Sequence, residues 1–184
     1  MRVVAGKFRG RTIKSPNSAA IRPTADRLRE SLFNILVHAY GNPIVDARVL
    51  DLFAGTGALG IEAISRGARS VLFVDDSAEG RALVRENVEA FALGGIAKIF
   101  RRDATNLGHV HPNEPFTLVF CDPPYGKGLA ELALTSAHRG GWLAPGAIAI
   151  VEEATDAKFA APEGFEELER RAYDDTEFVI LRAA

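Results

Sequence analysis

Short apolar runs alternate with helix-like stretches through the central part of the chain. Five runs rich in Val, Ile, Leu and Phe read RVLDLF, SVLFVD, KIFRRD, FTLVFCD and AIAIVEE. Between them, helices are expected near residues 58–66, 78–92 and 128–139. A strand that is apolar at almost every position is buried on both faces, as in parallel sheets whose strands are connected by helices. The sequence therefore predicts an α/β fold with a mostly parallel sheet covered on both faces.

The two ends of the chain differ from this central pattern. TADRLRESLFNILVHAY starts at Thr24, a helix start signal, and has apolar residues at helical spacing, so residues 24–39 are expected to form an amphipathic helix. GFEELERRAY and TEFVILRAA have few helix signals and are separated by two aspartates, which favours an antiparallel pair of strands. We expect an N-terminal extension of residues 1–40, a hairpin plus a helix, and a second domain of residues 41–184.

The charge is distributed unevenly along the chain. With 184 residues, 47% of them hydrophobic, the chain can bury one sizeable core. Its net charge is −2, but residues 1–30 hold eight Lys and Arg against two acidic residues. A basic extension on an acidic body fits a protein that binds a polyanion such as nucleic acid. It fits an ordinary solvated surface equally well.

Several classes of protein and site are disfavoured. No run is long enough to span a membrane, and MRVVAGKFRGR lacks the apolar core of a signal peptide, so we expect a cytoplasmic protein without membrane contacts. Cys121 is the only cysteine, which excludes an internal disulfide and a cysteine-based zinc site. We expect it to pack as a small hydrophobe. The four histidines show no metal-ligand spacing, so no metal is expected.

A glycine-rich loop follows the first predicted strand of the sheet. In LDLFAGTGALGIEA, Gly55, Gly57 and Gly60 form a GxGxxG pattern that opens a helix. The pattern fits proteins that bind NAD, FAD or S-adenosylmethionine, and a tight turn would need only one or two of the glycines. Asp75 ends the next strand, where a carboxylate can accept hydrogen bonds from ribose hydroxyls. Loop and acid together favour an adenosine-containing ligand.

Four aspartates lie at the ends of predicted strands: Asp51, Asp75, Asp103 and Asp122. The carboxyl ends of parallel strands meet at one edge of a sheet, where ligands bind. Asp51 lies in an apolar strand end and would be costly to bury without donors, which a cationic amino-acid group or ordered water would supply. Asp103 could accept a hydrogen bond from an adenine amino group, or act as a helix cap or loop acid. These acids favour S-adenosylmethionine over a dinucleotide.

The stretch CDPPYGK ends the strand FTLVFCD. Two prolines force a stiff exit from the strand, because proline cannot continue a sheet ladder and restricts the residue before it. The side chains of Asp122 and Tyr125 would then be held at the carboxyl edge of the sheet. The alternative is a plain proline turn that ends a strand.

Together these features resemble the class I S-adenosylmethionine-dependent methyltransferases, and DPPY resembles the [N/D/S]PP[Y/F/W] signature of those that methylate exocyclic or amide nitrogens. RVVAGKFRGRTIKSP and IRPTADRLRESLFNIL are similar to the N-terminal signature of the bacterial 16S rRNA guanine-N2 methyltransferases. The resemblance runs from Arg2 to about Arg182. It implies a Rossmann-like, mostly parallel seven-stranded sheet with an antiparallel C-terminal strand. The family usually has Glu where this chain has Asp75-Asp76, so which of the two would bind ribose stays open.

The resemblance also implies roles for single residues. Asp122 and the Pro123 carbonyl would hold the target amine, and Tyr125 would stack on the base. The expected cofactor-binding residues are Asp51, Phe53, Gly55, Thr56, Gly57, Asp75, Asp103 and Ala104. The arginines expected to contact RNA phosphates are Arg9, Arg11, Arg22, Arg27 and Arg29. Two of them, Arg27 and Arg29, could instead pair with Asp26 or Glu30.

We therefore expect an enzyme that transfers a methyl group from S-adenosylmethionine to the exocyclic N2 of one guanine in 16S ribosomal RNA. S-adenosylhomocysteine would be the second product, the substrate an assembled 30S subunit, and the protein a monomer. An N-methyltransferase acting on DNA adenine or protein glutamine is the same-class alternative. Two functions of different classes also compete: a nicotinamide-dependent oxidoreductase, which would give Asp122 and Tyr125 no task, and a non-catalytic RNA-binding module.

Overall fold

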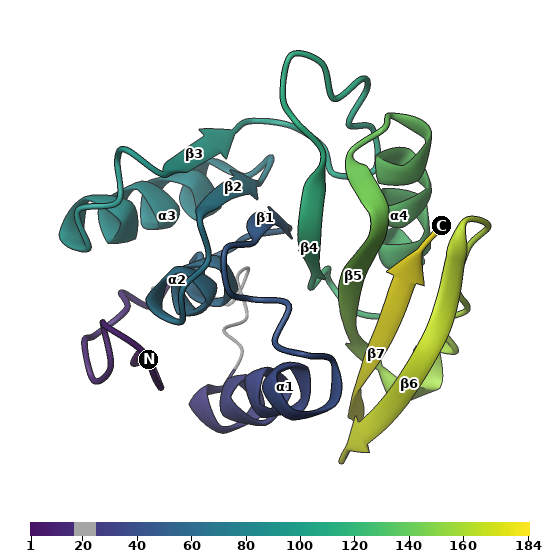
Figure 1. The fold of residues 1–184 in the computed structure, drawn as a ribbon, viewed down its shortest axis with the longest axis horizontal. Helices are drawn as coiled ribbons and strands as arrows, with labels where there is room; N and C mark the ends of the chain where they lie inside the picture. Colours follow the sequence, from purple (N-terminus) through teal and green to yellow (C-terminus); the bar gives the residue numbers. More distant parts are fainter. Residues whose placement is uncertain (17–24) are drawn as a thin grey trace.

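The computed structural model describes residues 1–16 and 25–184 (Figure 1). The strands are β1 (Arg48–Leu52), β2 (Ser70–Val74), β3 (Ala97–Phe100), β4 (Phe116–Cys121), β5 (Leu143–Ala154), β6 (Phe165–Tyr173) and β7 (Thr176–Ala183). The α-helices of the described residues are α1 (Asp26–Ala39), α2 (Ala58–Ser65), α3 (Ala78–Ala90) and α4 (Leu129–Arg139). The predicted strands and helices therefore form, with bounds that differ by a few residues. Thr24, the predicted helix start, lies outside the described residues.

The seven strands form one sheet in the order β3-β2-β1-β4-β5-β7-β6. Neighbours from β3 to β5 pair in parallel, and β7 lies antiparallel between β5 and β6. This confirms the predicted seven-stranded, mostly parallel sheet with an antiparallel C-terminal strand. The predicted antiparallel pair at the end of the chain is formed by β6 and β7, shown in yellow in Figure 1.

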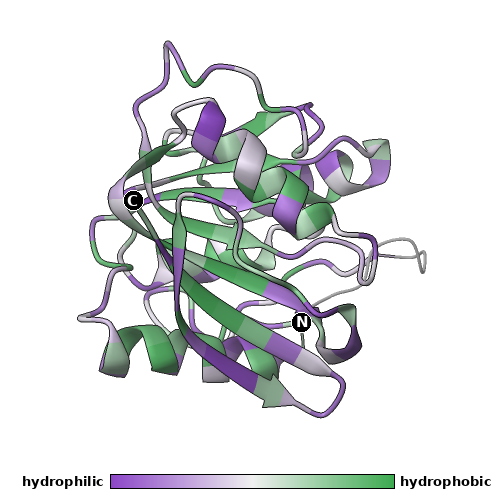
Figure 2. Cartoon of the chain, turned by 90° about the vertical axis from the view of Figure 1, so that its right-hand side faces the viewer, coloured by the Kyte–Doolittle hydropathy of each residue, from purple (hydrophilic) through white to green (hydrophobic). Residues whose placement is uncertain are grey.

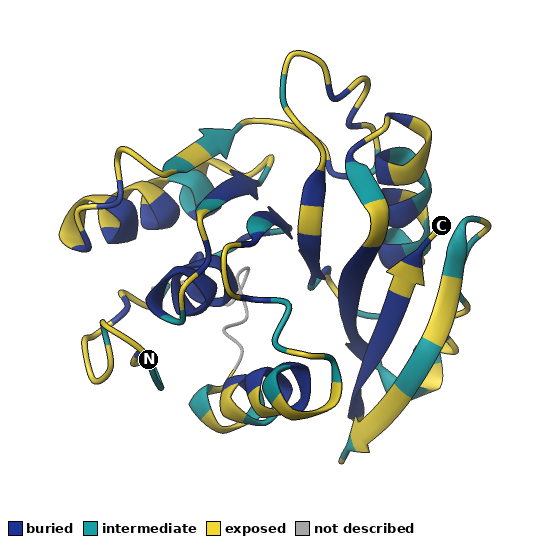
Figure 3. Ribbon diagram, viewed as in Figure 1, coloured by how far each residue is buried: buried dark blue, intermediate teal, exposed yellow. Residues whose placement is uncertain are grey.

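Helices cover both faces of the sheet. On one face, Val49 and Phe120 of the strands pack in one core cluster with Leu36 of α1 and Ile61 of α2. Alternate residues of a strand point to opposite faces, so the next residues along each strand pack with α4 and the long connection between β3 and β4. The central strands are consequently buried along most of their length (Figure 3). That burial explains why they are apolar at almost every position.

Strand β6 forms one outer edge of the sheet and has a different composition. Its sequence FEELERRAY is mostly charged, and Figure 2 shows it as largely hydrophilic beside its hydrophobic neighbours. Charged side chains along an edge strand discourage pairing with another chain. In the described part of the chain, no helix is long and apolar enough to cross a membrane.

The start of the chain folds back on itself and packs on the body. Arg2 and Thr12 form an isolated antiparallel bridge, and Val3 and Ile13 are buried in the same core cluster as α1, α2 and α3. The predicted N-terminal hairpin is therefore present, and we call residues 1–14 the hairpin. The division into domains of residues 1–40 and 41–184 stays a prediction.

Candidate functional site

The aspartates that end the predicted strands meet at the carboxyl edge of the sheet. Leu52 of β1 lies in register with Val74 of β2 and Cys121 of β4. Asp75 and Asp122 directly follow those two residues, and Asp51 directly precedes Leu52. Two segments follow the strands at this edge. The glycine-rich loop joins β1 to α2, and the DPPY turn follows β4. Parallel pairing thus places both motifs on neighbouring strands.

The glycine-rich loop has an unusual backbone that glycine permits. Gly55 and Gly57 have φ values of +60° and +82°, a region that residues with a Cβ rarely adopt. Gly60 has a packing reason, since a Cβ there would lie 2.5 Å from Cε1 of Phe73. Phe53 also has a positive φ of +57°, a strained conformation for an aromatic residue that is typical of functional sites. Two glycines of the loop are thus required by their positive φ values, and the third by the close packing of α2 on β2.

Asp51 is 1% exposed and lies beneath this loop. Its Oδ2 accepts a hydrogen bond of 3.1 Å from the backbone N–H of Gly60. Burial raises the pKa of Asp51 well above its usual range, the Gly60 N–H lowers the pKa, and the nearby charge of Asp75 raises it further. A cationic group beside this carboxyl would favour its charged form.

Asp75 holds the loop from the neighbouring strand. Its Oδ2 accepts a hydrogen bond of 2.9 Å from the backbone N–H of Gly55, and its Oδ1 accepts one of 2.9 Å from the backbone N–H of Ser77. Asp76, in contrast, is exposed to solvent. Of the two adjacent acids, Asp75 is therefore the one that faces the glycine-rich loop.

Asp103 and Ala104 follow β3 at the same edge of the sheet. The Oδ1 of Asp103 accepts hydrogen bonds from the backbone N–H of Thr105 at 2.8 Å and from its hydroxyl at 2.7 Å. This is the loop-acid role that the sequence left open. Ala104 is buried in the core cluster on the α4 side. A contact of either residue with a cofactor stays a prediction.

The DPPY turn is attached to the end of β5 and the start of β7. The hydroxyl of Tyr125 donates a hydrogen bond of 2.5 Å to Oε2 of Glu152, and it lies 2.8 Å from Oγ1 of Thr176. One residue further on, the backbone N–H of Gly126 donates to Oε1 of Glu153 at 2.9 Å. Burial raises the pKa of Tyr125, and the charge of Glu152 raises it further, so the phenol stays a donor.

Sequence reasoning missed the residues that hold this turn. Glu152 and Glu153 carry a usable signal, because they are two acids at the end of AIAIVEE, a strand that reaches the same edge. Thr176 carries no such signal, because its place depends on its register with Ala154 in an antiparallel pairing. The structure confirms that Cys121 packs as a buried small residue, and burial raises the pKa of its thiol.

The predicted RNA-binding arginines lie in different surroundings. Arg9 is exposed at the tip of the hairpin, and Arg27 is exposed on α1. The guanidinium of Arg11 donates to the carbonyl of Ala90 at 2.6 Å and lies 4.3 Å from the ring of Phe91, so it holds the hairpin on the end of α3. Arg22 lies outside the described residues.

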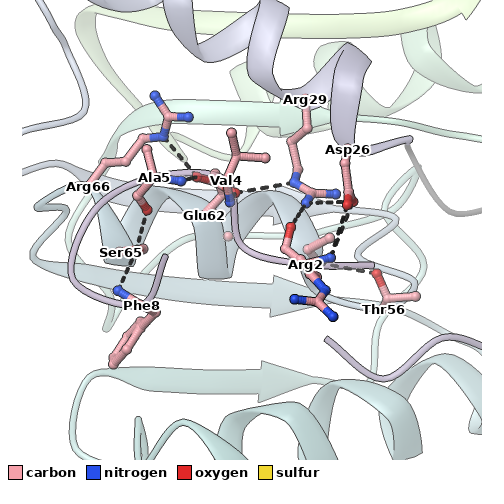
Figure 4. A network of polar contacts seen from close by, with 12 residues as sticks. Arg2, Val4, Ala5, Phe8, Asp26, Arg29, Thr56, Glu62, Ser65 and Arg66 are labelled. Atoms are coloured by element: carbon pink, nitrogen blue, oxygen red, sulfur yellow. Dashed lines mark hydrogen bonds and ion pairs between the residues drawn. The ribbon is translucent and has the colours of Figure 1, made fainter. Parts of the chain in front are cut away.

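Arg29 requires a correction. Its side chain is fully buried, with Nε 3.3 Å from Oε1 of Glu62 and Nη2 3.0 Å from Oδ1 of Asp26 (Figure 4). It also donates to the backbone carbonyl of Arg2 in the hairpin. A buried guanidinium held by two carboxylates is not available to RNA phosphates, so that prediction is wrong. The alternative pairing with Asp26 is confirmed.

Across residues 1–16 and 25–184, no group of three or more His, Cys, Asp or Glu side chains is arranged to hold a metal ion. The donors and acceptors of the site have a different character. Asp51, Asp75 and Asp103 offer carboxylate acceptors around a loop of glycines. Such a set suits a ligand rich in hydrogen-bond donors.

Comparison with known proteins matches nearly the whole chain to one protein family. The model of the family described as conserved hypothetical protein 95 matches residues 1–182. Ribosomal RNA small subunit methyltransferase D from Escherichia coli strain K12 is 39% identical over 153 residues, which is 83% of this chain and 74% of that protein. The protein of the same name from Haemophilus influenzae is 34% identical over 167 residues, or 90% of this chain and 84% of its own.

Solved structures give the same picture of the fold. The structure of yhhF from Escherichia coli has a TM-score of 0.83 and 30% identity, over 100% of this chain and 97% of that one. Magnesium protoporphyrin IX methyltransferase from Synechocystis, solved with bound S-adenosylmethionine, has a TM-score of 0.61 and 19% identity. That match covers 86% of this chain and 79% of the other. At 19% identity it shows the shared fold alone.

Proposed function

This chain belongs to the family described as conserved hypothetical protein 95, with the bacterial ribosomal RNA small subunit methyltransferases D as relatives, and from that premise we propose that it methylates the exocyclic N2 of one guanine in 16S rRNA. It is an S-adenosylmethionine-dependent rRNA methyltransferase. The observation that carries the choice of an exocyclic nitrogen is the DPPY turn on β4, next to the glycine-rich loop on β1. Fold alone would not support that choice.

The residues of the loop and the strand ends fit S-adenosylmethionine. Its ammonium group would lie near Asp51, whose raised pKa reflects burial that a cation would offset. Its ribose hydroxyls would donate to Asp75, and its adenine amino group to Asp103. Phe53, Gly55, Thr56, Gly57 and Ala104 would complete the contacts, with the glycines allowing close backbone approach. When bound, S-adenosylmethionine supplies a methyl group activated by its sulfonium; no metal is required.

The ribose contact leads to a prediction on two adjacent acids. Asp75→Ala is expected to weaken S-adenosylmethionine binding by about tenfold or more, because it removes a charged acceptor and the hydrogen bond that holds Gly55. Asp76→Ala is the matched control, and its affinity should stay within about twofold of the wild type. Isothermal titration of both variants measures the difference. The reverse ranking would assign the ribose contact to Asp76.

The DPPY turn would act on the guanine. The N2 lone pair is delocalised into the ring, so the amine is a poor nucleophile that must be held in line with the methyl group. The carboxylate of Asp122 and the carbonyl of Pro123 would accept its N–H groups and stabilise positive charge that develops on the nitrogen. The ring of Tyr125 would stack on the guanine taken out of the RNA stack.

The exposed arginines would position the RNA. We infer that Arg9 and Arg27 contact phosphates of 16S rRNA in the 30S subunit, and that the protein acts there as a cytoplasmic monomer. Arg22 is proposed for the same role from the sequence alone. Arg11 makes a contact that holds the hairpin, so its contribution to RNA binding would be smaller.

Reversing one charge tests the phosphate contact. Arg9→Glu is expected to weaken RNA binding about fivefold and to reduce the slope of log affinity against log salt by about 1. Arg139→Glu makes the same charge change at the exposed end of α4, on the other face of the sheet, and should leave the slope unchanged. Equal slopes for Arg9→Glu and the wild type would show that Arg9 is a solvated surface residue that does not contact a phosphate.

A comparison of acceptors tests the proposed substrate against its rivals. Purified protein and radiolabelled S-adenosylmethionine are incubated with four acceptors: small ribosomal subunits lacking their native guanine methylations, the same RNA without protein, unmethylated DNA, and bacterial protein extract. We expect label in the RNA, with more in the assembled subunits. Label in DNA or protein alone would support the adenine or glutamine alternative instead.

A further inference from the structure

The side chain of Tyr125 is held at its far end by two residues of different strands. Its hydroxyl donates to Glu152 of β5 at 2.5 Å and lies 2.8 Å from the hydroxyl of Thr176 of β7. Both partners are buried, with Glu152 4% exposed. Burying a carboxylate is costly unless its charge is compensated, so this contact would be unusual as packing alone.

The pairing of β5 with β7 does not depend on the side chains of Glu152 and Thr176. Glu152 lies in register with Phe178, and Ala154 with Thr176, in a continuous antiparallel ladder of backbone hydrogen bonds. The neighbouring Glu153 accepts the backbone N–H of Gly126 and so holds the main chain of the turn. Glu152 and Thr176 act on a different part of the turn, the phenol of Tyr125.

A hydrogen bond from a phenol restricts the orientation of its ring. The O–H of tyrosine lies in the ring plane, because the oxygen lone pair conjugates with the ring, so an acceptor at a fixed place resists rotation of the ring. The backbone on the near side is already stiff, since Pro123 and Pro124 precede Tyr125. The ring is thus fixed at both ends, by the proline turn and by the hydroxyl contacts.

We propose that Glu152 and Thr176 are positioning residues for the methyl transfer, which orient the ring of Tyr125 as the platform for the target base. This role rests on the proposed function, in which the base stacks on that ring. In-line attack depends on the orientation of the base, so a ring free to rotate would slow the transfer step without weakening cofactor binding. The expected signature is a lower kcat at an unchanged affinity for S-adenosylmethionine.

The first test needs no substrate. The protein is labelled with tyrosine carrying carbon-13 at Cζ, and the Tyr125 signal is assigned by its loss in Tyr125→Phe. In the wild type this signal should not titrate up to about pH 10.5, whereas in Glu152→Gln it should titrate at a lower pH than in the wild type, because the charge of Glu152 no longer raises the pKa, while burial still holds the pKa above its ordinary value of about 10. Gln keeps an acceptor but removes the charge. An identical titration in both proteins would overturn the proposal.

The second test is a double-mutant cycle on the transfer rate. Tyr125→Phe and Glu152→Ala are each expected to lower kcat about tenfold, and Glu152→Ala should cause little further loss in the Tyr125→Phe background. Glu152→Gln should recover most of the rate, and Thr176→Val should show a milder loss. Full kcat in Tyr125→Phe, or losses that multiply, would overturn the proposal.

A matched control separates orientation from stability. Glu177→Gln changes a different buried acid, on β7, which pairs with Arg170 at 2.8 Å, and this variant should keep the wild-type kcat. Thermal unfolding of every variant shows which of them are folded at the assay temperature. Failure of the wild-type protein to methylate RNA would contradict the proposed function and with it the role in transfer, whereas the titration of Tyr125, measured without RNA, separately tests whether Glu152 holds the phenol.

Discussion

Replacing Asp122 with alanine is expected to reduce methyl transfer by about a thousandfold while leaving the affinity for S-adenosylmethionine nearly unchanged. The transfer rate and the cofactor affinity should respond differently because the DPPY turn and the glycine-rich loop are separate segments. Asp122 follows β4 on the DPPY turn, whereas the glycine-rich loop is held by Asp51 and Asp75. Single-turnover measurements with RNA give the transfer rate, and isothermal titration gives the cofactor affinity.

Asparagine at the same position separates shape from charge. Asp122→Asn keeps one acceptor oxygen of similar placement but loses the negative charge that would stabilise a developing cation. We expect its transfer rate to lie between those of the wild type and Asp122→Ala. Comparable losses of transfer rate and cofactor affinity in Asp122→Ala would contradict the assigned role.

The largest effect on stability is expected from Glu62→Ala, which should lower the free energy of unfolding by about 3–5 kcal/mol. Glu62 is fully buried on α2, and its Oε1 accepts from the backbone N–H of Val4 and from Arg29. Its Oε2 accepts from the backbone N–H of Ala5 and from Arg66 (Figure 4). Removing the carboxylate leaves a buried guanidinium and two hairpin N–H groups without this acceptor.

An exposed ion pair provides the control for this prediction. Glu114 lies 3.7 Å from Nε of Arg48 and is mostly exposed, so Glu114→Ala should cost less than about 1 kcal/mol. Urea unfolding measures both variants. If Glu62→Ala were destabilised by no more than Glu114→Ala, the network that joins the hairpin to α2 would not contribute to stability as described.

The arrangement of the sheet could be predicted because its physical cause is visible in the sequence. Strands covered on both faces must be apolar at almost every position, and β1, β2 and β4 show this pattern. The convergence of Asp51, Asp75 and Asp122 followed from parallel pairing, which brings carboxyl ends to one edge.

The burial of Arg29 was missed although the sequence holds a signal for it. Arg29 precedes Leu32, Phe33 and Leu36 by three, four and seven residues, so all four lie on one face of α1. A charged residue on that face implies a buried partner. The partner, Glu62, is the one charged residue of the mostly apolar helix α2, and only the tertiary fold brings the two together.

The contacts that hold the site could not be predicted in the same way. Tyr125 and Thr176 are far apart in the chain, and their contact depends on the register of β7 against β5. A shift of one residue would point Thr176 to the other face. The DPPY motif predicts what the turn presents, whereas the residues that orient it depend on pairing that a local pattern does not specify.

Identifying the methylated nucleoside tests the central claim most directly. Small subunits lacking their native guanine methylations are incubated with the protein and radiolabelled S-adenosylmethionine, and their rRNA is digested to nucleosides and separated by chromatography. The proposed function predicts that all label migrates with N2-methylguanosine. Label in any other nucleoside, or no label while the protein binds S-adenosylmethionine, would contradict it.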